Sequence, residues 1–301
     1  MPARPAISSL FLLLSLWLVW GASWVVSKAG LAYATPLQMV QYRLLLAVLT
    51  LGGLLLWRGR RSGFQRPPFW PTLWLGLTQT TGFTLLSTLA LLQTGTGKVT
   101  ILCYTMPFWT LLLARLFLGE TVRRVQWLAV AIALCGLVLV LAPWQQQPGG
   151  MGSLLAIAAG ICWSVAAIVA RRLHLQQETD TLALTFWQLL FGLVPLYLIS
   201  WGWPQPPMHW QWPFIGILLF NGCLAAGLGW LIWLHLLSRL TAGTAGLNML
   251  AIPAVALVGA WWWLGDMPTA AEWAGMGLIG VALALLALFN YRLDREALGL
   301  Q

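Results

Sequence analysis

Three cationic side chains stand apart from the other basic residues because each lies inside or at the edge of a long apolar run: Lys28, Arg43 and Lys98. Guanidinium and ammonium groups bind carboxylates and phosphates, and the planar fork of arginine fits a carboxylate. Arg43 follows Pro36 by seven residues, which in a helix is on the order of 10 Å. An arginine at that depth in a membrane faces water or an acceptor. Lysines at the ends of such runs can also reach the membrane surface, so both interpretations of Lys28 and Lys98 stay open.

Uncharged polar side chains recur at helical spacing along several apolar runs. They are Gln38, Gln41 and Tyr42; Thr78, Gln79, Thr81, Thr84 and Thr88; Thr181, Thr185 and Gln188; and Thr244 and Asn248. Polar residues commonly bond helices together within membranes, so a structural role is open for each. Stripes on several runs nevertheless favour a shared central cavity. The candidate substrate-binding residues among them are Gln41, Tyr42, Thr78, Gln79, Thr81, Gln188 and Asn248.

Aromatic side chains also lie well inside apolar runs, too deep for the interfacial belt where tryptophan gathers. Trp20, Trp24 and Trp163 have this placement, and Tyr104 lies in another run. We expect these rings either to line the walls of a cavity or to fill the core of a bundle. All four are therefore candidate substrate-binding residues as well.

The composition excludes a soluble globular domain. The chain has 301 residues, is 60% hydrophobic and 8% charged, and has a mean hydropathy of +0.81, whereas about a quarter of the residues in soluble domains are charged. The net charge of +9 does not indicate a nucleic-acid partner, because the basic residues are scattered over short loops. No motif of a hydrolase, zinc protease or glycosidase is present, and the four cysteines have no C-x-x-C spacing. We expect no enzyme activity, no cofactor, no metal site and no nucleic-acid partner.

Ten apolar windows are long enough to cross a bilayer, which takes about 20 residues each. The predicted helices are 7–28, 37–57, 72–93, 97–118, 124–142, 152–171, 181–201, 212–237, 242–264 and 271–291. Proline and glycine separate several of them, as at 34–36 and 203–207. The sequence thus predicts an all-α membrane protein with ten transmembrane helices in a lipid bilayer.

The two halves of the chain repeat one another. Pro107–Trp127 and Pro253–Trp273 share a proline, a Leu-Gly-acid turn and a closing tryptophan at matching positions. Such internal duplication in an apolar chain is typical of secondary transporters. Pro107 and Pro253 would each free a backbone carbonyl in the middle of a helix. They are expected to act as hinges beside a cavity or as packing kinks.

The orientation follows from the basic residues, which gather on the cytoplasmic side of membrane proteins. With the N-terminus inside, 13 of the 16 basic residues fall in the cytoplasm. Five predicted helices per half is an odd number, so the second half must enter the membrane inverted. We therefore expect two inverted five-helix repeats, 7–142 and 150–291, with both termini cytoplasmic and the chain in the inner (plasma) membrane. A homodimer is left open.

Short motifs in a fixed order resemble the EamA-type family of the drug/metabolite transporter superfamily over almost the whole chain. They are Trp20-Gly-Ala-Ser-Trp24, then Lys28, Pro36 and Arg43; Leu118-Gly-Glu120 with Trp127; and Leu264-Gly-Asp266 with Trp273. The resemblance implies ten helices, cytoplasmic termini and export of amino acids or other small metabolites through a central cavity. The second half departs from the pattern, since Ala167 stands where a counterpart of Lys28 is expected.

The leading hypothesis is a secondary transporter that exports small metabolites by alternating access, with amino acids or similar amphipathic compounds as substrates. Aromatic walls suit apolar side chains, and the three cations suit a carboxylate. The alternative is a transporter of nucleotide sugars or other phosphorylated metabolites, which would need more cations in the cavity. A membrane enzyme acting on lipid-linked substrates is disfavoured, because the predicted helices contain no acid pair and no nucleophile beside a base.

Overall fold

The computed structural model shows a bundle of helices and describes residues 5–62, 66–93, 99, 102–121, 123–141, 150–264, 267 and 269–297. No strand occurs among these residues. The first half contains α1 (Pro5–Gly30), α2 (Pro36–Ser62), α3 (Phe69–Leu75), η1 (Gly76–Gly82), α4 (Phe83–Gln93), α6 (Met106–Phe117) and α7 (Arg124–Leu141). The second half contains α8 (Gly150–Gln176), α9 (Thr181–Trp201), α10 (Trp212–Leu219), η3 (Phe220–Leu228), α11 (Gly229–Arg239), α12 (Ala242–Asn248), α13 (Ala251–Leu264) and α14 (Ala270–Ala297).

Among the described residues, five helical stretches are long and apolar enough to cross a membrane. They are Leu10–Ser27, Pro36–Gly59, Gly150–Gln176, Thr181–Trp201 and Trp212–Arg239. Shorter apolar helices accompany them, among them Met106–Phe117 and Arg124–Leu139. A helix satisfies its backbone polar groups internally, which hydrocarbon requires of any spanning segment. This is the architecture of a multi-pass membrane protein.

Polar side chains cap several helices where the apolar runs begin. Thr35 and Gln38 each accept the other's backbone N–H at the start of α2, and Thr269 and Glu272 do the same at the start of α14. At the start of α9, the Asp180 carboxylate accepts from two backbone N–H groups. These bonds satisfy donors that a helix start leaves free, so they fix where the helices begin.

Two of the predicted helices are interrupted at corresponding places in the two halves. The predicted helix 97–118 turns at Tyr104–Thr105 before α6 begins, and the predicted ninth helix is divided between α12 and α13. Pro107 and Pro253 therefore lie in the first turn of a new helix, where proline is well tolerated. The prediction that both lie in the middle of a helix was wrong, and their role as hinges stays a prediction.

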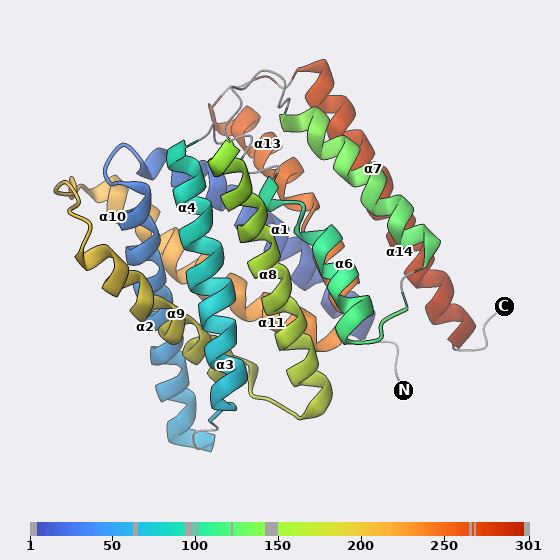
Figure 1. Ribbon diagram of the computed structural model, residues 1–301, viewed down its shortest axis with the longest axis horizontal. Coiled ribbons are helices and arrows are strands. Elements are labelled where there is room, and N and C mark those ends of the chain that lie inside the picture. Colours follow the sequence, from blue (N-terminus) through green and yellow to red (C-terminus); the bar gives the residue numbers. More distant parts are fainter. Residues whose placement is uncertain are drawn as a thin grey trace.

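A π-helical segment widens one long helix in each half. η1 lies between α3 and α4, and η3 lies between α10 and α11, so each long helix continues through its π segment. In Figure 1 these two long helices belong to the main bundle, whereas α7 and α14 run together along one side of it. Segments with i→i+5 bonds are rare and often occur at functional sites. The sequence did not predict them.

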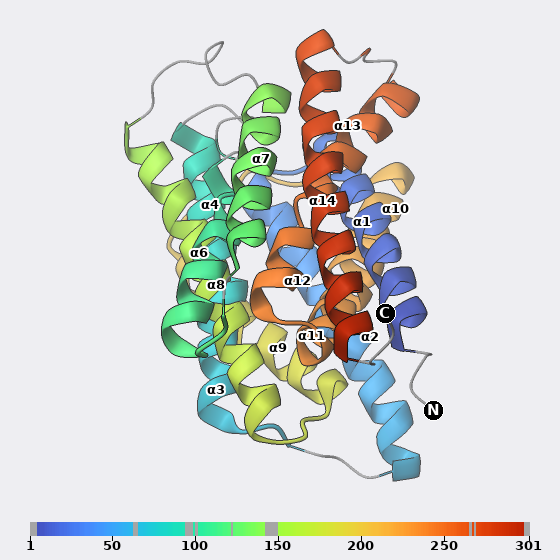
Figure 2. The ribbon, with the colours of Figure 1, turned by 90° about the vertical axis from the view of Figure 1, so that its right-hand side faces the viewer.

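The two halves interlock in matching pairs of helices. α2 packs against η3 and α9 against η1, while α1 packs against α13 and α6 against α8. The pair α2–η3 corresponds to the pair α9–η1 when each helix is replaced by its counterpart in the other half, and α1–α13 corresponds to α8–α6 in the same way. α7 and α14 form a pair of their own, visible side by side in Figure 2. This exchange of partners is what a two-fold relation between the halves requires.

Glycines bring the backbones of these pairs together at equivalent positions. A Cβ atom at Gly76 of η1 would lie 2.8 Å from the backbone oxygen of Gln188 on α9. A Cβ atom at Gly222 of η3 would lie 3.0 Å from the backbone oxygen of Arg43 on α2. Any larger residue at Gly76 or Gly222 would therefore push the helices apart.

The arginines mark one end of the bundle. The end of α2 and the corners α6–α7, α8–α9 and α11–α12 lie there with the start of α1 and the end of α14 (Figures 1 and 2). The arginines of this arginine end whose side chains the structure describes are Arg58, Arg66, Arg115, Arg123, Arg124, Arg171, Arg172 and Arg239. Arg58 forms an ion pair with Asp180 and so joins α2 to α9. The start of α2 and the segment between α9 and α10 lie at the opposite end.

We predict that Gly192→Ala destabilises the protein by about 1–3 kcal/mol, as overpacking of a closed site typically does. The added methyl group would clash with Thr80 of η1 and lie 2.6 Å from the backbone oxygen of Gly76. Gly53→Ala on α2 is the matched control, because no described atom lies within 4 Å of the position that its Cβ would take. Thermal unfolding in detergent should show a lower Tm for Gly192→Ala only. Equal Tm values for the two variants would contradict the close contact of α9 with η1.

Candidate functional site

Tryptophans from both halves meet in the middle of the bundle. The ring of Trp163 on α8 lies 5.8 Å from that of Trp20 on α1, and 5.9 Å and 5.7 Å from those of Trp230 and Trp233 on α11. Phe83, at the start of α4, lies 4.9 Å from Trp163. All four tryptophans are buried. This tryptophan cluster is therefore part of the packed core of the bundle.

Two buried indole N–H groups in the tryptophan cluster have no hydrogen-bond partner among the described residues. The Trp20 N–H donates to the Ala225 carbonyl of η3 at 2.8 Å, whereas those of Trp163 and Trp233 are buried and unpaired. Leaving a buried donor unsatisfied costs about 1–3 kcal/mol. Such groups are therefore candidates to bind a ligand or water. The sequence pattern singled out Trp20 and Trp163 but not Trp233, although Trp230 and Trp233 have helical spacing.

Trp24 and Tyr104 make a separate aromatic contact. The Trp24 N–H donates to the Tyr104 hydroxyl at 3.3 Å, and the two rings lie 6.4 Å apart. Tyr104 is buried in the turn before α6, whereas Trp24 is 39% exposed. This pair therefore reaches the surface of the bundle, unlike the tryptophan cluster.

The polar residues of η1 face α9 across the boundary between the halves. The Gln188 amide donates to the Gln79 Oε1 atom at 2.7 Å, and the Thr81 hydroxyl donates to the Gly192 carbonyl at 2.8 Å. Gln79 and Gln188 have no exposed surface. Thr78 instead donates to a carbonyl of its own helix. The structure thus brings Gln79, Thr81 and Gln188 together and leaves Thr78 out.

Two polar residues of α2 are held by neighbouring segments. The Gln41 amide donates to the Leu196 carbonyl at 3.3 Å and to the Ser200 hydroxyl, both on α9. The Tyr42 ring lies 5.6 Å from that of Trp210, edge to face. Interhelical bonding accounts for Gln41 without a substrate.

Arg43 is the next residue of α2, and its side chain is half-buried. Its Nε atom is buried and has no hydrogen-bond partner among the residues that the structure describes. No ion pair involves Arg43 within the part of the chain that the structure describes. A guanidinium in an apolar bundle is costly unless water or a ligand meets it. The position favours Arg43 as the group that binds an anion.

The remaining predicted substrate-binding residues are Asn248, Lys28 and Lys98. Asn248, at the end of α12, donates to the Thr244 carbonyl of its own helix at 2.8 Å. Lys28 lies near the end of α1, where the structure describes its backbone. Lys98 lies outside the described residues. A role in substrate binding stays a prediction for all three.

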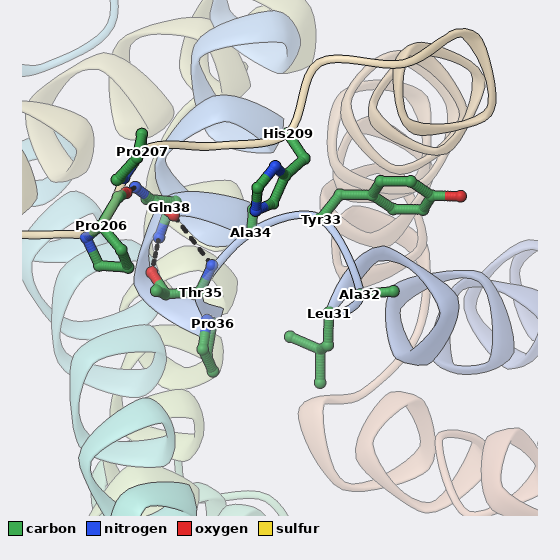
Figure 3. A pocket seen from close by; sticks show the side chains of 10 residues that line it. All are labelled: Leu31, Ala32, Tyr33, Ala34, Thr35, Pro36, Gln38, Pro206, Pro207 and His209. Atoms are coloured by element: carbon green, nitrogen blue, oxygen red, sulfur yellow. Dashed lines mark hydrogen bonds between the residues drawn. The ribbon is translucent and has the colours of Figure 1, made fainter.

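A shallow pocket at the opposite end contains none of the predicted site residues (Figure 3). Its volume is about 310 Å³, and it lies between the turn 31–36 and the segment that holds Pro206, Pro207 and His209. Gln38 supports it by accepting from the Thr35 N–H at 2.9 Å and donating to the Pro206 carbonyl at 2.6 Å. The pocket brings no lysine, arginine or carboxylate together. The interior groups are therefore the better candidate site.

A polar clamp joins the two halves at the arginine end. Arg171 on α8 donates to the carbonyls of Leu237 and Ser238 at the end of α11, both at 3.1 Å. Its Nε atom lies 3.8 Å from the carboxylate of Glu120, which follows α6. Glu120 in turn accepts from the backbone N–H of Ala242 at the start of α12, at 3.2 Å. The clamp joins the corner α11–α12 to the corner α6–α7. The sequence pattern did not single out Arg171 as part of such a clamp.

Comparison with known proteins identifies the family to which the chain belongs. The sequence profile of the EamA-like transporter family matches the chain twice, over residues 7–142 and 150–288. The chain belongs to this family. The predicted family is thereby confirmed, and the helices described above are those of an EamA-like transporter.

Two relatives and one solved structure are similar to this chain over nearly its full length. The "Uncharacterized inner membrane transporter YedA" of Escherichia coli (strain K12) is 25% identical over 300 residues, which are 93% of this chain and 90% of that protein. A "Probable amino-acid metabolite efflux pump" of Salmonella typhimurium (strain LT2) is 28% identical over 300 residues, 95% of this chain and 97% of that protein. A solved structure titled "Crystal structure of protein" shares the fold, with a TM-score of 0.82 and 18% identity over 94% of this chain and 99% of its own.

We predict that Arg43→Gln inserts normally but transports an anionic or zwitterionic substrate about 10-fold more slowly or worse, the loss expected for one charge-assisted hydrogen bond. Folding should not suffer, because the Arg43 Nε atom has no partner to lose. Arg172→Gln is the control, because Arg172 is exposed at the arginine end. Flux would be measured at matched protein levels. Unchanged flux through a well-inserted Arg43→Gln variant would assign Arg43 a structural role.

Proposed function

We propose that this EamA-like transporter is a secondary transporter of the inner membrane that exports amino acids or similar amphipathic metabolites by alternating access. The name of the Escherichia coli relative supports the inner membrane as the location of this protein. The name of the Salmonella relative supports amino-acid metabolites as the substrate class and export as the direction.

Unpartnered polar atoms where the two halves meet are the observation that carries this proposal. They are the Nε atom of Arg43, the Nε2 atom of Gln79, the Oε1 atom of Gln188 and the indole N–H groups of Trp163 and Trp233. Water is absent from the bilayer core, so a polar substrate crossing it needs such groups as replacement partners. A single guanidinium suits one carboxylate, and the tryptophan rings suit an apolar side chain.

The architecture that we propose is ten transmembrane helices in two inverted five-helix repeats, 7–142 and 150–291. The matching helix pairs of the two halves support the repeat. Both termini would be cytoplasmic, because the arginine end carries the start of α1 and the end of α14, and arginines favour the cytoplasmic side. The clamp of Glu120 and Arg171 would then close the cytoplasmic end, and the protein would load substrate when that clamp opens.

Counterflow in proteoliposomes tests the proposal. Vesicles holding the purified protein would be loaded with one unlabelled compound and given the same compound, labelled, outside; the panel would contain neutral amino acids, sugars and nucleotide sugars. We expect labelled apolar amino acids to accumulate above the level in protein-free vesicles, because one guanidinium suits a carboxylate better than a diphosphate. Counterflow of nucleotide sugars alone would support the phosphorylated-metabolite alternative. No counterflow of any compound would contradict the proposed function.

A further inference from the structure

Among the described residues, four buried polar atoms remain unpaired on the long helix α3–η1–α4 and on α9, which packs against η1. They are the Nε2 atom of Gln79, the hydroxyls of Thr80 and Thr84, and the Oε1 atom of Gln188. All four residues are at most 2% exposed. Buried polar groups are nearly always hydrogen-bonded, so a concentration of exceptions calls for an explanation. Three of these four residues lie in or directly after η1, and π-helical segments often occur at functional sites.

The repeat relates Gln188 to Arg43. A Cβ atom added at Gly76 would lie 2.8 Å from the backbone oxygen of Gln188, and one added at Gly222 would lie 3.0 Å from that of Arg43. The same added atoms would also approach the Cβ atoms of Phe191 and Leu46, which lie three residues after Gln188 and Arg43 respectively. Gln188 therefore occupies on α9 the position that Arg43 occupies on α2.

Arg43 and Gln188 lie at equal depths from opposite ends of the bundle. Arg43 is seven residues past the start of α2 at the opposite end, and Gln188 is seven residues past the start of α9 at the arginine end. Each is on the order of 10 Å along its helix. A substrate crossing between the halves would therefore meet one of them on the way in and the other on the way out.

The two positions offer different chemistry. Arginine only donates hydrogen bonds. The bond from Gln188 to Gln79 uses one donor and one acceptor of the two amides, which leaves an NH₂ group on Gln79 and a carbonyl oxygen on Gln188. One donor beside one acceptor suits a head group that carries both a carboxylate and an ammonium.

We infer that Gln79 and Gln188 form a second substrate subsite near the arginine end, which binds the zwitterionic head group of an amino acid. The Gln79 amide donates to the carboxylate, and the Gln188 carbonyl accepts from the ammonium. Arg43 binds the carboxylate when the substrate is nearer the opposite end. In the described conformation both glutamines are fully buried, so the subsite becomes accessible only when the arginine end opens. This inference rests on the proposed function.

Gln188→Leu tests the subsite, because leucine has a similar size and makes no hydrogen bonds. KM would be measured from each side, in inside-out and right-side-out membrane vesicles, with a neutral amino acid that the wild type transports. Removing one or two hydrogen bonds should raise KM from the arginine end about 5- to 10-fold and leave KM from the opposite end nearly unchanged. Arg43→Gln should show the reverse asymmetry.

Ser87→Ala is the control, because the Ser87 hydroxyl donates to a carbonyl of its own helix on α4. Gln79→Leu is the second variant, used if Gln188→Leu does not reach the membrane. A deaminated analogue with only a carboxylate should inhibit the wild type and Gln188→Leu equally from the arginine end, since it has no ammonium for Gln188. An equal change in KM from both sides, or none, would overturn the subsite. If the wild type transports no compound of the panel, the proposed function fails instead.

Discussion

The contact of α9 with η1, and its counterpart between α2 and η3, is the constraint on which the rest of the structure depends. Within a bilayer the hydrophobic effect does not drive helices together, so close packing and hydrogen bonds must hold them. Gly76 and Gly192 let α9 approach η1, and the bond between Gln79 and Gln188 forms there. Both contacts join one half of the chain to the other, so any motion between the halves must alter them. The unpartnered polar atoms of Arg43, Gln79 and Gln188 belong to these same packed helices, which links the candidate site to the packing.

Much of the fold could be predicted because membrane helices must be long and apolar, and because prolines and Leu-Gly-acid turns mark the repeat. The π segments could not, since their widened geometry accompanies contacts with α9 and α2 that lie far away in the sequence. The turn at Tyr104–Thr105 was also missed. Proline at the start of a new helix and proline within a kinked one look alike in an apolar run.

Site residues could be predicted from the sequence where a polar or charged side chain stands among apolar ones. A guanidinium or an amide inside an apolar run is conspicuous, and this is why Arg43 and Gln188 were singled out. Trp233 was not, because this chain is rich in tryptophan and only the structure shows that its N–H lacks a partner. Arg171 resembled the other arginines at helix ends, since the carbonyls that it binds belong to α11. Gln41 was conspicuous for the same reason as Gln188, yet bonds to α9 explain it.

The inverted relation between the halves is tested most directly by cysteine labelling at the ends of two equivalent helices, α2 and α9. Ser62 ends α2, and Gly202 directly follows α9. Each would be replaced by cysteine in a chain without the four native cysteines, and a membrane-impermeant thiol reagent would be added to intact cells. Inversion predicts that Gly202→Cys is labelled and that Ser62→Cys is spared until the membrane is permeabilised. Labelling of both variants in intact cells would place both positions on the same side and contradict the inverted repeat.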